Sequence, residues 1–165
     1  MMQQEVSIQE QVKQLGILYL ALIAGQLGMF IVLFLVIENN STETADGALG
    51  GGFMPLIISL FSVMSIGMAF LIYNKRKENG RQIEGGLYEK ITHFRTSFMV
   101  RAAVIEGVNF LALIVYFFID SNYLYLVIFV IGISAFFLIR PTIDRLIEDY
   151  QLSANEQSEL HNSLK

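Results

Sequence analysis

The sequence predicts an all-α integral membrane protein, a four-helix up-down bundle with amphipathic cytoplasmic terminal helices. Apolar residues make up 54% of the 165-residue chain, and the mean hydropathy of +0.54 is well above that of soluble domains. The chain contains four apolar stretches close to or above the length of about 20 residues that crosses a bilayer. Hydrocarbon offers no partner to free backbone groups, so we expect each stretch to be a helix.

The spans are predicted at residues 15–37, 53–73, 98–119 and 123–139, within a transmembrane domain of residues 15–139. The first is longer than the apolar core of a signal peptide, and no small-residue cleavage site follows it, which favours a retained span. Only the tripeptide DSN separates the last two spans, so we expect them to form a tight hairpin.

Helical segments are predicted on both sides of this domain. Residues 1–14 form an amphipathic N-terminal lead, and residues 140–165 form a cytoplasmic helical tail with apolar residues at helical spacing: Ile143, Leu146, Ile147 and Tyr150. Within the tail, Ser153 and Glu156 have the spacing of a capping box, which starts another short helix. The segment YEKITHFRTSF predicts that the third helix begins before its membrane span.

Basic residues predict the orientation of the chain. The connection before the third span contains the run KRK at 75–77 and further bases at Arg81, Lys90 and Arg95, whereas the connections after the first and third spans contain none. Lysine and arginine of short loops stay on the cytoplasmic side. Both termini are therefore expected in the cytoplasm. We expect a bacterial inner membrane, with the lipid bilayer as the surrounding partner.

Composition excludes several kinds of site. The chain has no cysteine, so it has no disulfide, thiolate metal site or thiol nucleophile. Its two histidines, His93 and His161, lie in polar segments, which argues against a haem held between helices. We predict no catalytic residue, metal, cofactor or nucleic-acid partner.

The most informative residue is Glu106, a carboxylate near the middle of the third span. An acidic group at that depth costs about 2.5–3.5 kcal/mol, and such groups normally face other helices or a wet cavity. Asn109 lies one turn further along, Tyr116 continues the same stripe, and Gln26 of the first span is a candidate partner for Glu106 or Asn109. Arg101 is rotated by about 140° from Glu106 and is expected to extend towards the cytoplasmic interface.

Two interpretations of these polar residues remain open. In the first, hydrogen bonds between helices would fix helix packing, and each bond would contribute about 1 kcal/mol to helix association. Alternatively, Glu106 would be an ion-binding residue, because a carboxyl that is neutral in an apolar surrounding can both donate a hydrogen bond and carry a proton. Catalysis would need a second titratable group or a metal constellation at helical spacing, and the sequence contains none.

Residues 95–117, RTSFMVRAAVIEGVNFLALIVYF, resemble the carboxylate-bearing helix of the ATP synthase proteolipid, subunit c. The likeness lies in Ala102, Ala103, Ile105, Glu106 and Gly107. The resemblance implies that the Glu106 carboxyl binds a transported proton or sodium ion. The chain departs from that family in its loop, where NKRKENGRQIEGG replaces an Arg-Gln-Pro motif, and in the orientation of its termini.

Two functions follow as hypotheses. In the first, the chain is a small non-enzymatic integral membrane protein. It would be a subunit or scaffold of a membrane complex with an intramembrane polar packing site, and its partners would be further copies or other membrane proteins. In the second, it is a proton or cation translocating unit that uses Glu106.

Overall fold

The computed structural model describes residues 7–39, 53–119 and 122–164, and all regular structure in these ranges is helical. The helices are α1 (Ile8–Asn39), α2 (Met54–Arg81), α3 (Leu87–Phe118), α4 (Tyr123–Leu138), α5 (Ile143–Tyr150) and α6 (Ala154–Ser163). The predicted all-α class is confirmed for these residues. The start of the N-terminal lead (1–6), most of the connection after the first span (40–52) and residues 120–121 and 165 lie outside the described ranges.

Three of the described helices are long and apolar enough to cross a membrane, over Ile8–Val36, Pro55–Arg81 and Leu87–Phe118. The α4 and α5 helices meet this criterion only as a pair, and their axes are bent by 78°. A helix rises 1.5 Å per residue, so α4 is about 24 Å long, less than the roughly 30 Å of hydrocarbon. The described chain thus has three candidate spans, or four if the bent pair is one.

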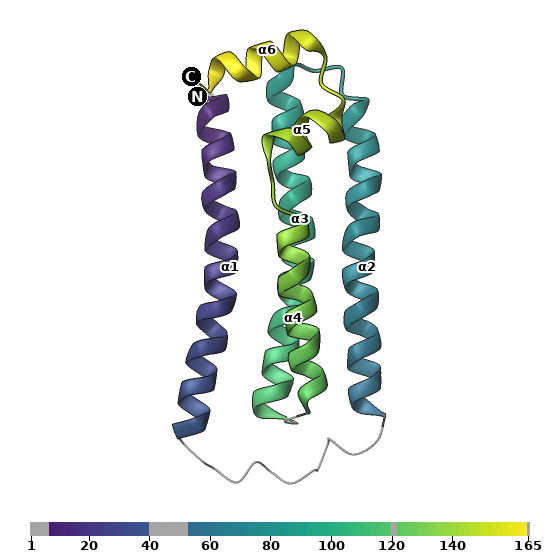
Figure 1. The fold of residues 1–165 in the computed structure, drawn as a ribbon. Helices are drawn as coiled ribbons and strands as arrows, with labels where there is room; N and C mark the ends of the chain where they lie inside the picture. The colour runs from purple at the N-terminus through teal and green to yellow at the C-terminus, as the bar shows by residue number, and fades with distance from the viewer. Residues whose placement is uncertain (1–6, 40–52, 120–121, 165) are drawn as a thin grey trace, which may run out of the picture.

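The α3 helix occupies the centre of the molecule. It packs against α1, α2 and α4, while α2 also contacts α4 and α5, and α1 reaches α6. Figure 1 shows α1, α2 and α3 running along the length of the molecule, with α5 and α6 across the end where α1 begins. In its most apolar window α3 buries 50% of the residues, against 11% for α1 and 17% for α2. The outer helices therefore expose most of their apolar surface, as expected in a lipid solvent.

The buried apolar residues form two clusters along α3. The cluster nearer α5 and α6 includes Phe98, Phe136 and Tyr150. The cluster towards the α3–α4 connection includes Leu113 and Tyr125. Asn109 of α3 interrupts the second of these clusters, since Val108 precedes it and Ala112 follows it there, and its side chain is fully buried.

The helices α2 and α3 extend well beyond their predicted spans. Only residues 82–86 separate them, because α2 continues to Arg81 and α3 begins at Leu87. The early start of α3 agrees with its apolar spacing. The extension of α2 was not predicted, and it has a tertiary cause: Arg76 hydrogen-bonds to α3 and Lys77 forms an ion pair with α5.

The chain changes direction after α4, where it continues through α5 to α6. The Thr142 side chain accepts a hydrogen bond from the Arg145 amide and caps α5. Gln151 ends α5 in the left-handed region, with φ 49°, which is uncommon for a residue other than glycine. Ser153 and Glu156 then form the capping box that starts α6, as their spacing predicts. These caps fold the tail back onto the bundle.

Candidate functional site

Gln26 and Asn109 meet in the interior, between α1 and α3. The Asn109 amide Nδ2 donates a hydrogen bond to Gln26 Oε1 at 2.5 Å. Both side chains are buried, with 1% and 0% of their surface exposed. The bond joins residues 83 positions apart in the chain. It is therefore a tertiary contact that holds α1 against α3 where their surroundings are apolar.

The α4 helix reaches the same point through Gly132. A Cβ atom added to Gly132 would overlap the side-chain amide of Asn109, chiefly Oδ1. Glycine is thus required here for close approach of the α4 backbone to Asn109. Three helices meet at this amide pair, and we call Gln26, Asn109 and Gly132 the amide site.

The amide site leaves two polar atoms without partners. Gln26 Nε2 and Asn109 Oδ1 are buried and have no hydrogen bond to any described residue. Each such atom normally costs about 1–3 kcal/mol in a protein interior. The site favours the observed packing of α1 against α3, because separating the two amides would leave still more polar atoms unpaired.

Glu106 is outside the amide site. Its side chain is half-buried on α3 and forms no hydrogen bond or ion pair with any described residue. Ala103 and Gly107, next to it on the helix surface, are exposed. A Cβ at Gly107 would have no heavy atom of another described segment within 4 Å. The carboxyl therefore lies beside an open surface of α3, in the middle of a candidate span.

Tyr116 does not contact Glu106. It is half-buried and its ring contacts Phe117 and Tyr123, with centroid separations of 4.9 and 6.4 Å. Ten residues of helix separate Tyr116 from Glu106, which corresponds to about 15 Å along the axis. Of the four residues singled out by sequence, the structure thus joins Gln26 and Asn109 directly and leaves the other two apart.

A second polar cluster surrounds Arg101, and the expectation that this side chain extends to the aqueous interface is wrong. Only 4% of Arg101 is exposed. Its Cζ lies 3.7 Å from the ring centroid of Tyr73 and 5.5 Å from that of Phe70. Its Nη2 donates to the Ile139 carbonyl at 3.5 Å, where α4 ends. Aromatic rings and the negative end of a helix dipole thus stabilise the buried cation in place of water.

Asp149 of α5 connects to the same cluster. Its carboxylate accepts a hydrogen bond from the Tyr73 hydroxyl at 2.5 Å and lies 3.2 Å from Lys77 Nζ. Its backbone carbonyl accepts a hydrogen bond from Arg81 Nε at 2.8 Å. Three residues of α2 therefore hold one residue of α5, and we call these four residues with Arg101 the α5 latch.

Neighbouring contacts join α3 to α5 and to α2. His93 Nδ1 lies 2.8 Å from the Tyr150 hydroxyl, and Arg76 Nε donates to Ser97 Oγ at 3.0 Å. A Cβ at Gly80 would overlap the Tyr150 ring. Sequence reasoning missed this cluster and the α5 latch, and the one available signal was the charged Arg101 next to an apolar run.

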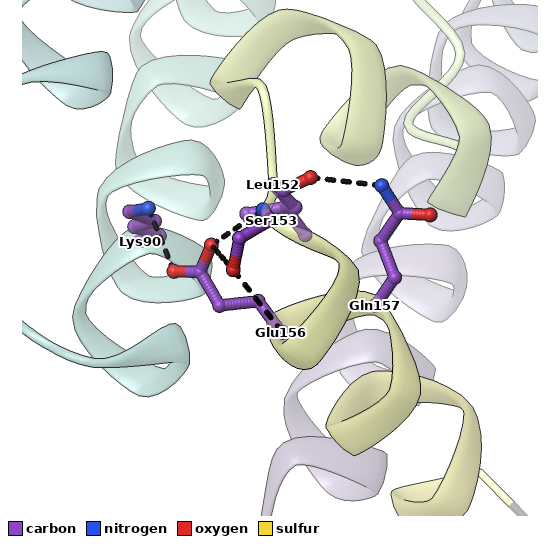
Figure 2. A network of polar contacts seen from close by, with 5 residues as sticks. All are labelled: Lys90, Leu152, Ser153, Glu156 and Gln157. Atoms are coloured by element: carbon purple, nitrogen blue, oxygen red, sulfur yellow. Dashed lines mark hydrogen bonds and ion pairs between the residues drawn. The ribbon is translucent and has the colours of Figure 1, made fainter.

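The α6 helix is attached to the start of α3 by a charged contact (Figure 2). Lys90 Nζ lies 2.7 Å from Glu156 Oε1, while the other carboxylate oxygen accepts from the Ser153 amide and hydroxyl. Gln157 Nε2 donates to the Leu152 carbonyl at 2.8 Å. Burial alone would raise the pKa of Glu156. The hydrogen bonds from Lys90 and Ser153, with the charge of Lys90, outweigh burial and lower it.

Among the described residues, no three histidine, aspartate or glutamate side chains come together as metal ligands would. The chemistry available at the amide site is hydrogen bonding, since neither amide titrates in the ordinary pH range. Proton exchange is available at Glu106. No known protein family, curated protein or solved structure matches this chain.

Proposed function

We propose that the chain is a small non-enzymatic membrane protein, a subunit or scaffold of a membrane complex, with the amide site as its intramembrane polar packing site. It spans the membrane four times as an up-down bundle, with α4 and the bend before α5 as the fourth crossing. The length and apolar surface of α1, α2 and α3 support the membrane assignment. Its partners are the lipid bilayer and either further copies or other membrane proteins.

We further propose that both termini and the connection between α2 and α3 are cytoplasmic, in a bacterial inner membrane. Most described basic residues support this orientation, because they lie in the first part of α1 or α3, in the last part of α2, or in or just before α5. Figure 1 shows these parts at the end where α5 and α6 lie across the helices. These residues are Lys13, Lys75, Arg76, Lys77, Arg81, Lys90, Arg95, Arg140 and Arg145. An excess of lysine and arginine in short cytoplasmic loops sets the overall orientation of membrane proteins. The amphipathic α5 and α6 would then offer cytoplasmic docking surfaces.

The hydrogen bond between Asn109 and Gln26 is the observation that carries the scaffold proposal. It connects two candidate spans in an apolar interior, and a glycine of α4 is packed against it. Its groups can neither exchange protons at ordinary pH nor act as nucleophiles. Such a contact contributes to the choice of neighbouring helix and to the register of the two helices. A subunit of a membrane complex requires this kind of defined packing.

A double-mutant cycle tests this role. Gln26→Leu and Asn109→Leu are made singly and together, and unfolding in mild detergent is measured. Each single variant leaves an amide unpaired, so the double variant should be less destabilised than the sum, with a coupling of about 0.5–2 kcal/mol. Ser59→Ala is the matched control, because the Ser59 hydroxyl bonds only within its own helix, to the Pro55 carbonyl. Additive effects would count against the packing role.

Complex formation is tested separately. The tagged chain is extracted from native membranes in mild detergent and its size is compared with the 18.6 kDa of one chain. The scaffold proposal expects a larger stable particle, whose size decreases in the Gln26→Leu/Asn109→Leu variant. A particle of one chain alone in every detergent would contradict it.

The second candidate function is proton or cation translocation by Glu106, of the kind that its proteolipid-like surroundings imply. The unpaired, half-buried carboxyl beside an open face of α3 favours it. Flux into liposomes is compared for the original chain, Glu106→Gln and the exposed-site control Glu148→Gln. Loss of flux in Glu106→Gln alone, with unchanged unfolding, would support translocation. Equal flux in all three would exclude it.

A further inference from the structure

We propose that the open face of α3 around Glu106 binds the same face of a second copy, and that the two Glu106 carboxyls pair as hydrogen-bonded acids. This inference rests on the scaffold function and names its partner and its contact surface. The Glu106 face consists of Met99, Ala103, Glu106, Gly107 and Ile114.

The described part of the chain leaves the Glu106 carboxyl without a polar partner. No described residue hydrogen-bonds to its carboxyl or pairs with its charge, although it lies in the middle of a candidate span. An unpaired acidic group at such a depth is costly, and such groups normally face another helix or a wet cavity. The neighbouring amide site shows that this bundle can pair polar groups when a partner is near. A second chain can therefore supply the partner that the Glu106 carboxyl lacks among the described residues.

The surroundings of Glu106 allow another helix to come close. Ala103 and Gly107 are small and exposed, and no other described segment covers Gly107. Met99 and Ile114 are 37% and 42% exposed and extend the face along the helix. Small residues flanking a polar group are typical of helix contacts in membranes, because they let two backbones approach closely.

Chemical complementarity favours a second copy as the occupant. A neutral carboxyl has one donor and one acceptor, so two of them satisfy each other. A two-fold axis brings the same residue of both chains together without any further group. The cation nearest in sequence, Arg101, is buried against Tyr73 and is not available on this face.

Cysteine cross-linking tests the contact directly, because the chain contains no cysteine of its own. Ala103→Cys and Gly107→Cys place a thiol on the Glu106 face without changing Glu106. Val63→Cys and Val130→Cys are controls on exposed surfaces of α2 and α4, where 56% and 61% of the side chain is exposed. In native membranes, copper phenanthroline should produce the disulfide-linked dimer from the first two variants and little from the controls.

Two substitutions of the carboxyl complete the test. Glu106→Gln keeps a donor and an acceptor, so its dimer should dissociate at nearly the same concentration. Glu106→Leu removes both, and its dimer should dissociate at a concentration about tenfold higher, as expected for one intramembrane hydrogen-bonded pair. Unfolding of each monomer in detergent reports any loss of the fold.

Cross-linking of Ala103→Cys no stronger than that of Val130→Cys, or only to a different protein, would overturn the proposal. So would equal dimerisation of Glu106→Leu and Glu106→Gln. A chain that does not dimerise through this face, but runs as part of a larger particle and retains the coupling between Gln26 and Asn109, would refute the dimer and leave the scaffold function standing. A cross-linked dimer without that coupling would refute the packing role alone.

Discussion

The guanidinium of Arg101 on α3 is stacked over the ring of Tyr73 on α2, with 3.7 Å between Cζ and the ring centroid. The hydroxyl of the same tyrosine donates to Asp149 on α5. Tyr73 therefore connects a buried cation to the helix that closes this end of the bundle. The face of its ring and its hydroxyl make separate contacts, so two substitutions can separate their contributions.

Tyr73→Phe keeps the ring under Arg101 and removes the hydrogen bond to Asp149. We expect a loss of about 1–2 kcal/mol in the free energy of unfolding, measured in detergent. Tyr73→Leu also removes the ring, and we expect a further loss of about 1–2 kcal/mol because a desolvated guanidinium loses its aromatic partner. Equal stability of the two variants would show that the stacking contributes nothing.

Gly132→Ala should disrupt the amide site. The new Cβ would overlap the Asn109 side chain, so α4 or the amide must move. We expect destabilisation of about 1–3 kcal/mol, as for overpacked cores, in thermal or chemical unfolding. Gly67→Ala on α2 is the control, since its Cβ meets nothing within 4 Å, and alanine there should be neutral or up to about 1 kcal/mol more stable. A tolerated Gly132→Ala would contradict the close approach of α4.

Asp149→Ala should loosen α5. It removes the acceptor of the Tyr73 hydroxyl and the partner of Lys77, which leaves α5 with fewer contacts to α2. Hydrogen exchange of the α5 amides should become about 5- to 30-fold faster, which corresponds to 1–2 kcal/mol of local opening. Glu148→Ala, an exposed neighbour on the same helix, should leave exchange nearly unchanged. Similar exchange in both variants would argue against the α5 latch.

Acid should weaken the attachment of α6. The pKa of Glu156 is lowered in the folded chain, so the unfolded chain binds more protons as the pH falls. The resulting stabilisation is complete above the ordinary carboxyl value of 4.5 and is lost as the pH falls through the lower folded value. The difference in melting temperature between the original chain and Glu156→Gln should therefore shrink as the pH falls below 4.5. Glu159→Gln, exposed on the same helix, should show no such trend.

Sequence reasoning predicted the helices better than their contacts. The early start of α3 and the capping box at Ser153 follow from local spacing, and both are present. The length of α2 beyond residue 73 was missed, because polar residues 74–81 carry no apolar repeat. They remain helical because α3 and α5 provide partners for Arg76 and Lys77. Local propensity contains no information about such partners.

The candidate site was predicted only in part for a similar reason. Gln26, Glu106 and Asn109 stand out as polar residues in apolar runs, whichever way the helices pack. Their pairing depends on how far each helix is rotated and shifted, and the structure joins Gln26 to Asn109 while Glu106 stays apart. Arg101 was expected at the aqueous interface because a long side chain can normally reach it. Tyr73 and the end of α4 instead hold it inside.

The sequence by itself determined which stretches are long and apolar enough to cross a bilayer, that these stretches are helical, and which polar residues lie within them. These follow from run length, composition and spacing, all of which are local. The tertiary structure alone decided that α3 is central, that Gly132 meets Asn109, that Asp149 meets Tyr73, and that Glu106 has no partner among the residues that the structure describes. Helical spacing fixes the angle at which a side chain projects from the axis of its own helix. The neighbour at that angle depends on the rotation and depth of the other helices.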